Sequence, residues 1–335
     1  AGGALIMGTI FKTIITRTEQ SAKMRELYPE QWLRQCYQEL QSVFLAFDGR
    51  MLISMVTGIV DEATGMLYFI NAEHPHVALR RDGQAEFVSE RGVLRKLGVD
   101  DPDQVFVVQT LPLNPNDVIL VGSDGRDDVQ VGTNEAGLAV VNEDERAFLG
   151  DVEQSDGRLD QLENLIRARG SVLDDLSLIR IAYREDAAAL VDSDGPDPRA
   201  LRTARAAYAQ KDFAAVRAAL DPLIGSLVPP APGTADGGRW RAVKRMLLRA
   251  CIETKDFEQA VRIADEYSER VPEDNQVLLW HSHVLERVGE TRRAIDVSER
   301  LLMRDPEHAR NRQHLARLHR RYGSPERARD LAAKP

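Results

Sequence analysis

The spacing of hydrophobic residues predicts two helices at the start of the chain. A first stripe at helical spacing consists of Met7, Ile10, Phe11, Ile14 and Ile15. Together with the opening glycines, which allow close contact with other backbone, it predicts a helix over about residues 3–24. Pro29 suits the first turn of a helix, and a second stripe follows it: Trp32, Leu33, Cys36, Leu40 and Val43.

The pattern then changes to short strands. Residues 51–61 and 65–73 are β-rich runs separated by "DEAT", which predicts a hairpin. Residues 76–89 repeat this design around a D-G turn, and residues 105–124 add two strands around a Pro/Asn turn. Antiparallel strands are therefore expected to follow one another.

A further helix and a closing strand complete this first part. Leu159, Leu162, Leu165 and Ile166 predict a helix that Gly170 ends, and "LSLIRIAY" (176–183) alternates as a strand. The expected architecture is α+β. Residues 184–199, "REDAAALVDSDGPDPR", are acidic, contain Pro and Gly, and are interpreted as a linker.

Everything after residue 200 has a helical pattern with an internal repeat. Three sets of residues recur at 34 residues: Ala260, Ala294 and Ala328; Pro272 and Pro306; Gly289 and Gly323. A small residue where two helices touch, followed by a proline, resembles the tetratricopeptide repeat. "KDFAAV" (211–216) matches "KDFEQA" (255–260) at a spacing of 44, which indicates a divergent first copy. We expect an all-α solenoid of about four repeats over 200–335.

The two parts of the chain also differ in their balance of basic and acidic residues. Residues 1–200 hold 19 Lys+Arg and 34 Asp+Glu, whereas residues 201–335 hold 25 and 19. Only two cysteines are present, which suits a reducing compartment, and we expect a cytoplasmic protein. The longest apolar stretches fall short of the roughly 20 residues that span a bilayer, and the start has no signal-peptide pattern.

Carboxylates at strand ends are the candidates for chemistry. Asp124 follows the aliphatic run 118–121, and the pair Asp174–Asp175 precedes the last strand. Either site alone is typical of a turn that bonds its own backbone. Two such sites in an acidic domain without a Cys/His cluster favour a hard cation such as Mg²⁺ or Mn²⁺.

Three motifs in order carry a family resemblance. "NAEHPH" (71–76), "NDVILVGSDG" (116–125) and "DDLSLI" (174–179) resemble the N-A-G-H-P, G-D-x-[VIL]-x-x-x-[ST]-D-G and D-D-x-[ST]-L segments of metal-dependent (PPM-type) Ser/Thr phosphatases of the SpoIIE/RsbU-like branch. The resemblance covers residues 1 to about 183. "AGGALIMGTIFKTI" looks like the family helix that follows a D-x-x-G-H-G segment.

The resemblance implies a fold, a cofactor and a reaction. The first part (1–183) would be the C-terminal part of an αββα phosphatase sandwich. Two Mn²⁺ or Mg²⁺ ions would be held by Asp124, Asp174 and an aspartate before Ala1, and would activate water for attack on a phosphomonoester. This chain alone is then expected to be inactive. Supporting positions would be Asn71, His74, Ser123, Gly125 and Asp175.

Several neighbouring residues depart from the family pattern or stay open. Glu73 and Asn116 stand where the family has turn glycines. Asp127 and Asp128 are interpreted as solvated turn carboxylates, with a negative rim as the alternative. His74 and His76 would share one face of a strand, so a metal role is the alternative to a structural one.

Histidines and arginines in the repeats suggest no further chemistry. His281 and His283 should point to different faces of a helix and cannot chelate together. The Arg-rich end is interpreted as a solvated capping helix, so no nucleic-acid partner is expected.

Two functions follow. In the first, the protein dephosphorylates phosphoserine or phosphothreonine on a regulatory protein, such as an antagonist of an anti-sigma factor, and the repeats bind a protein or peptide partner. In the alternative, the first part is a non-catalytic phosphatase-like scaffold and the repeats alone do the binding.

Overall fold

The chain forms two compact units. The computed structural model describes residues 2–62, 64–89, 93–184, 198–226, 229, 238–322 and 324–333. One unit combines Ala1–Ile59 with Leu67–Ala187, and the other combines Val60–Met66 with Ala188–Pro335. Most of the proposed linker, residues 185–197, lies outside the described residues, so its role and the domain boundaries stay predictions.

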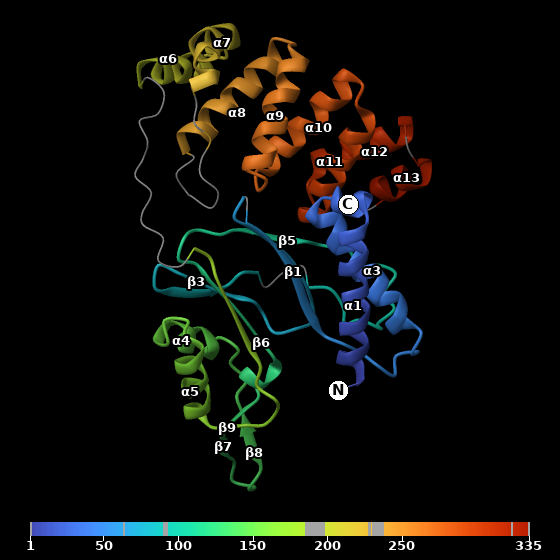
Figure 1. Cartoon of the computed structure of the whole chain (residues 1–335), viewed down its shortest axis with the longest axis vertical. Coiled ribbons are helices and arrows are strands. Elements are labelled where there is room, and N and C mark those ends of the chain that lie inside the picture. Colours follow the sequence, from blue (N-terminus) through green and yellow to red (C-terminus); the bar gives the residue numbers. More distant parts are fainter. Residues whose placement is uncertain are drawn as a thin grey trace. The chain divides into compact units, whose positions relative to one another are not determined.

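Helices α1 (Gly2–Gln20) and α3 (Pro29–Leu45) confirm the two opening stripes (Figure 1). The first helix is shorter than expected because Ser21 interrupts it and caps a separate short helix, α2 (Ala22–Arg25), by accepting from the Met24 N–H. Helix α3 starts at Pro29, and its buried face includes Leu33, Cys36, Leu40 and Phe44. These helices therefore form where the 3.6-residue period predicts them.

Strands follow as short antiparallel pairs in separate sheets. Their bounds are β1 (Met55–Asp61), β2 (Met66–Ala72), β3 (Ala78–Arg81), β4 (Gln84–Phe87), β5 (Gln109–Pro112), β6 (Val118–Gly122), β7 (Val129–Thr133), β8 (Ala139–Val141), β9 (Ser171–Val172) and β10 (Leu178–Ala182). The sheet orders are β1-β2-β5, β10-β6-β3-β4 and β8-β7-β9. The two expected hairpins are confirmed, and the D-G turn has positive φ at Asp82 and Gly83.

The second sheet is covered by two helices. Helices α4 (Ala147–Gln154) and α5 (Leu159–Arg169) lie beside it in Figure 1. A shared core joins them to the sheet: Ala78, Val118, Leu120, Val129, Phe148, Val152, Leu162 and Ile166. Gly170 ends α5 as expected. The unit is therefore α+β, with α4 and α5 packed against the sheet that contains β6 and β10.

From residue 198 onward, the regular elements in the described part of the second unit are all helices. Its helices are α6 (Pro198–Ala209), α7 (Phe213–Leu220), α8 (Gly238–Glu253), α9 (Phe257–Arg270), α10 (Asn275–Val288), α11 (Thr291–Arg304), α12 (Ala309–Tyr322) and α13 (Pro325–Ala333). They form four successive pairs, which confirms the all-α solenoid of tetratricopeptide type. Ala260, Ala294 and Ala328 are buried, as small residues at a helix contact must be.

Equivalent residues shape the turn inside each pair. Lys211, Lys255 and Gly289 all have positive φ at the end of a first helix. Asp212 and Asp256 then accept hydrogen bonds from the backbone N–H of Ala215 and Gln259, capping the second helices. The divergent first copy therefore has the same turn as the second. The equivalent Gly323 lies outside the described residues.

Histidines of the repeats pack between helices. The His281 ring lies 2.9 Å from Asp265 of α9, whereas the His283 ring stacks 3.9 Å from His314 of α12. The two histidines thus point to different faces, as expected. The Ser282 hydroxyl lies 2.9 Å from Nε2 of His314, and Nδ1 of His314 accepts from Arg317 at 2.9 Å.

The buried His314 should make the repeats sensitive to acid. Burial, and then His283 and Arg317, lower the pKa of His314 to about 3. Between this pKa and about 6.5, the unfolded chain binds the proton and the folded chain does not. We expect full stability above about pH 6.5 and a loss of up to about 1.4 kcal/mol per pH unit below it. Hydrogen exchange of α10 and α12 amides at pH 7 and pH 5 measures this slope. A His314→Gln variant with an unchanged slope would contradict the assignment.

None of the helices in the described part of the chain has both the length and the apolar character that a membrane crossing requires.

Candidate metal centre

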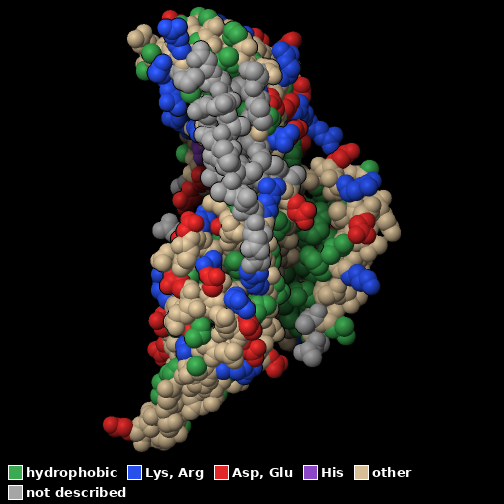
Figure 2. Space-filling view, turned by 60° about the vertical axis from the view of Figure 1, so that its left-hand side comes forward, with side chains coloured by type: hydrophobic (Ala, Val, Ile, Leu, Met, Phe, Trp, Pro, Cys, Tyr) green, Lys and Arg blue, Asp and Glu red, His purple; other side chains and the backbone are tan. Residues whose placement is uncertain are grey.

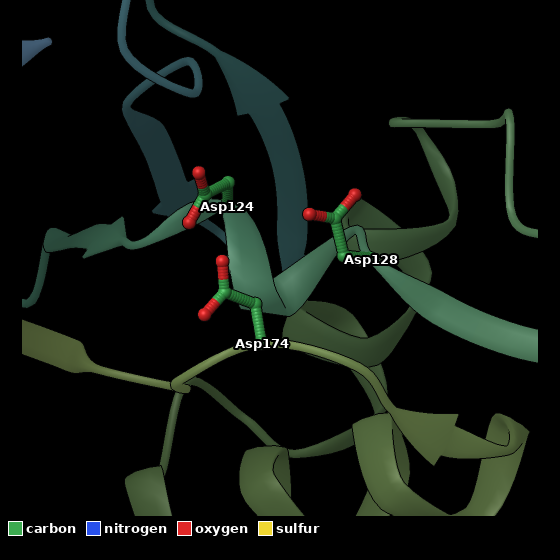
Figure 3. Close-up of side chains that lie close together, drawn as sticks. All are labelled: Asp124, Asp128 and Asp174. Carbon is green, nitrogen blue, oxygen red and sulfur yellow. The ribbon is translucent and has the colours of Figure 1, made fainter.

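Three carboxylates converge at one edge of the second sheet. Ligand oxygens of Asp124, Asp128 and Asp174 all lie within 4.8 Å of one another, and none of these residues is buried. Figure 3 shows Asp174 reaching from the loop before β10 towards Asp124, with Asp128 beside them. The structure therefore brings together the two predicted ligands and adds Asp128.

The strand register explains why Asp124 meets Asp174. Strands β6 and β10 are antiparallel neighbours, and Gly122 at the end of β6 pairs with Leu178 at the start of β10. A residue just after β6 and a residue just before β10 consequently fall at the same sheet edge. Residues 125–173, which lie between the two aspartates, leave this end of the sheet and return to it.

A tight turn brings Asp128 to the same place. Residues Asp124–Arg126 form a 3-10 turn, and the backbone N–H of Asp128 donates to the Asp124 carbonyl at 2.9 Å. The Asp128 carbonyl accepts from the N–H of Leu173 at 2.9 Å. This bond fixes the segment that contains Asp174 against the turn.

Ser123 joins the two segments through its side chain. Its hydroxyl donates to the Asp175 carbonyl at 2.7 Å and accepts from the Ser177 N–H at 2.9 Å. Its own N–H donates to the Ser177 carbonyl at 2.9 Å. Ser123 therefore fixes the distance between Asp124 and Asp174 without contributing a ligand.

Gly125 lies against the backbone of the opposite segment. A Cβ added there would come within 2.6 Å of the Asp175 carbonyl oxygen and 3.0 Å of the Asp174 carbonyl oxygen. Asp175 itself contributes this backbone contact, while its side chain is exposed and outside the carboxylate group. The glycine is thus required by close approach of two backbones.

A buried ion pair lies beneath the turn. Arg126 is fully buried, and its Nε donates to the Asp127 carboxylate at 3.0 Å. The guanidinium also lies 4.2 Å from the Phe148 ring, which is a cation–π contact. Burial lowers the pKa of Arg126 and raises that of Asp127, while their mutual attraction opposes both shifts. The interpretation of Asp127 as a solvated residue is therefore wrong.

Asn71 and His74 build the turn after β2. The Asn71 side chain accepts from the His74 N–H and donates to the His74 carbonyl, both at 2.8 Å. Burial, and then the charge of Arg126, lower the pKa of His74, whereas Asp124 raises it. His74 thus lies close enough to the carboxylates to be influenced by them, but it supplies none of the ligand atoms in this group.

Left-handed backbone appears at both positions where the family has glycine. Glu73 has φ +44° and Asn116 has φ +70°. Asn tolerates this conformation, whereas Glu73 is held there beside Arg95, whose guanidinium lies 2.7 Å from its carboxylate. Both residues therefore adopt the left-handed conformation that favours glycine.

The histidine alternative receives no support from the described residues. His76 lies in the loop between β2 and β3 rather than on a strand, and its ring packs against Phe87 at 5.5 Å. Within the described part of the chain, the group of potential metal ligands contains carboxylates alone.

Asp117 is a structural residue that the sequence motifs did not single out. Asp117 is buried, accepts from Arg81 at 2.9 Å, and accepts from the Asn114 N–H at 2.7 Å. It lies in the same motif as Asp124, so its position in the turn before β6 was the available signal. Its role is to fix the start of β6 rather than to bind metal.

The ligand set suits a hard divalent cation. No Lys or Arg in the described residues forms an ion pair with Asp124, Asp128 or Asp174. Three like charges within 4.8 Å repel one another unless a cation lies between them. All the donors are carboxylate oxygens, which Mg²⁺ and Mn²⁺ prefer. The residues present therefore fit the expected kind of metal.

Comparisons with known proteins agree with this architecture. The family model for Stage II sporulation protein E (SpoIIE) matches residues 1–184, and the chain belongs to this family. Its first unit is accordingly a phosphatase of the SpoIIE/RsbU kind. A search of curated proteins gave no match.

Several solved structures show weak likeness to parts of the chain. The SiaA-PP2C domain of Pseudomonas aeruginosa is 17% identical over 53% of this chain and 68% of that chain, with a TM-score of 0.38. The RsbU and RsbW domains of Rv1364c from Mycobacterium tuberculosis are 18% identical over 65% and 58%, also with a TM-score of 0.38. YrrB, described as a tetratricopeptide-repeat protein with an unusual peptide-binding site, is 10% identical over 40% and 64%, with a TM-score of 0.35.

Proposed function

We propose that the protein removes phosphate from phosphoserine or phosphothreonine of a regulatory protein, using Mn²⁺ or Mg²⁺ held by Asp124, Asp128 and Asp174. The observation that carries this proposal is the convergence of the three carboxylates within 4.8 Å. Family membership supports the phosphatase chemistry. The metal identity and the phosphoprotein are inferences from the donor chemistry and the family resemblance.

The residues of the site have separate roles in this proposal. Bound divalent ions would supply an activated water and positive charge for the phosphoryl oxygens. Asp124, Asp128 and Asp174 bind and orient the cations. Ser123 and Gly125 keep the two ligand segments in contact, and the buried Arg126–Asp127 pair supports the turn from below.

We further propose that the repeats recruit a protein partner. The four helix pairs form the stacked surface that such repeats use for peptides and helices. A substrate such as an antagonist of an anti-sigma factor is consistent with the family resemblance. Cytoplasmic location is supported by two buried, unpaired cysteines.

The test is Mn²⁺-dependent release of phosphate from a phosphoserine peptide. It uses the natural polypeptide, with whatever residues it has upstream of Ala1, and the 335-residue chain is assayed beside it. We expect turnover by the natural polypeptide and little or none by the chain alone, because the resemblance implies a further aspartate ligand. EDTA should remove the activity and added Mn²⁺ should restore it.

Failure of this assay would favour the scaffold alternative. If the natural polypeptide binds Mn²⁺ without hydrolysing any phosphopeptide or aryl phosphate, the phosphatase proposal is wrong. The repeats would then be the functional part of the molecule.

A further inference from the structure

Basic residues concentrate on one set of helices in the second unit. The first helices of the four pairs, α6, α8, α10 and α12, contain 14 Lys or Arg and only 2 Asp or Glu. The second helices, α7, α9, α11 and α13, contain 9 and 8. In Figure 2, blue and red side chains both appear on the visible surface of this unit. The positive charge of this unit therefore lies on its first helices.

Four of these side chains form a repeating series. Arg205, Arg249, His283 and Arg317 lie at intervals of 44, 34 and 34 residues, which are the repeat spacings. They consequently occupy the same place in successive first helices. Arg205, His283 and Arg317 are exposed, and the Arg249 side chain is 36% exposed. We call these four residues the basic ladder.

Contacts between helices connect three members of the ladder, Arg249, His283 and Arg317. The Arg249 guanidinium lies 5.7 Å from the Trp280 ring of α10. The His283 ring stacks on His314 of α12, beside Arg317. From Arg249 onward, the ladder positions are thus linked through neighbouring aromatic rings, from α8 through α10 to α12. Arg205 belongs to the ladder by its repeat spacing.

We infer that the basic ladder binds an acidic peptide segment of the protein partner. The inference deepens the proposed recruitment by the repeats and does not depend on the metal chemistry. Arginine guanidinium groups recognise carboxylates in a bidentate manner, and one such group recurs on three of the four first helices. Trp280 provides an apolar surface beside Arg249 for a side chain of the peptide.

Acidic residues on the same face favour a peptide over nucleic acid. Asp274 lies 3.2 Å from Arg245, and Glu286 accepts from Arg317 at 2.8 Å. Glu253 pairs with Arg249. A continuous phosphate backbone would meet these carboxylates at each repeat. Arg249 and Arg317 each have five N–H donors, so their ion pairs with Glu253 and Glu286 leave donors that a peptide carboxylate can use.

The test measures binding of a labelled glutamate-rich peptide to the complete chain by fluorescence anisotropy. We expect it to bind at least about tenfold more tightly than the same peptide with every glutamate replaced by glutamine. The variant R205Q/R249Q/R317Q should bind it about tenfold more weakly than the wild type, because three exposed charge pairs are lost together. Affinity should also fall as salt is raised.

A matched variant removes the same charge from the second helices. Arg262, Arg292 and Arg329 are exposed on α9, α11 and α13, and R262Q/R292Q/R329Q should retain the wild-type affinity. Equal losses in the two triple variants would show attraction by net charge alone and would overturn the proposal. Tighter binding of a single-stranded DNA of equal charge would also overturn it, in favour of nucleic acid.

Two further measurements distinguish failure of the ladder proposal from unfolding of a variant and from failure of the phosphatase proposal. Circular dichroism of both variants checks that the helices remain folded. Hydrolysis of a small aryl phosphate by the natural polypeptide should be unchanged in the ladder variant, because that substrate does not need the repeats. Loss of peptide binding with unchanged hydrolysis therefore supports the ladder, whereas absence of hydrolysis in the wild type concerns the phosphatase proposal alone.

Discussion

Replacing Asp124 or Asp174 with asparagine is expected to lower Mn²⁺-dependent phosphate release by at least about a hundredfold. Asparagine keeps one oxygen donor but loses the negative charge that offsets a divalent cation. Both residues belong to the group of carboxylates within 4.8 Å. Either change therefore removes one of the negative charges that offset the charge of the cation. The rate is measured on a phosphoserine peptide with the natural polypeptide, at saturating Mn²⁺ and then as a function of Mn²⁺ concentration.

Asp175→Asn is the matched control. It changes the same chemical group one residue away, on a side chain that is exposed and outside the ligand group. We expect it to retain most of the activity. Asp128→Asn should weaken Mn²⁺ binding by about tenfold or more, which electron paramagnetic resonance of free Mn²⁺ measures directly. Unchanged rates in both the Asp124 and Asp174 variants would show that the metal centre lies elsewhere.

The positions of Asp124 and Asp174 could be anticipated because strand ends are visible in the sequence. An aliphatic run ending in a carboxylate, and a carboxylate pair ahead of an alternating run, both predict side chains at a sheet edge. The antiparallel pairing of β6 with β10 then places the two ends together. The two strand ends lie together because β6 pairs with β10. The separation of fifty residues along the chain does not determine this pairing.

The different environments of Asp127 and Asp128 could not be predicted from the sequence. The sequence places them side by side in one polar turn, and composition cannot distinguish them. In the structure the 3-10 turn directs Asp127 to the buried Arg126 and returns Asp128 to Asp124. The difference arises from backbone geometry over four residues and from a buried arginine for which the hydrophobic pattern gives no signal.

In the fold as well, elements determined by local sequence were predictable, whereas those that depend on distant residues were not. Helices α1 and α3 follow from period, the β3–β4 hairpin from its D-G turn, and the repeats from internal spacing. The β7–β8 hairpin was missed because residues 131–140 are exposed throughout, so no face is marked by hydrophobic residues. Strands β5 and β6 are neighbours in sequence but belong to different sheets, which depends on packing alone.

Gly125→Ala is expected to damage both the stability and the metal affinity of the first unit. The added Cβ would lie 2.6 Å from the Asp175 carbonyl oxygen and 2.9 Å from its carbonyl carbon, and backbone atoms cannot rotate away. The segment carrying Asp174 must therefore move away from the turn carrying Asp124. Overpacking of this kind costs about 3 kcal/mol. Displacement of one ligand by a fraction of an ångström should also weaken Mn²⁺ binding by about tenfold.

Gly132→Ala separates the local clash from a general effect of removing a glycine. Gly132 lies in strand β7, seven residues further along the chain, and a Cβ there meets no atom within 4 Å. It should change stability by no more than about 0.5 kcal/mol. Hydrogen exchange of β6 and β10 amides reports the stability of this unit alone, and Mn²⁺ titration reports the site. If Gly125→Ala matched Gly132→Ala in both measurements, the two ligand segments would not be in backbone contact. The close packing of the Asp124 turn against the Asp174 segment, which supports the arrangement proposed for the metal, would then be wrong.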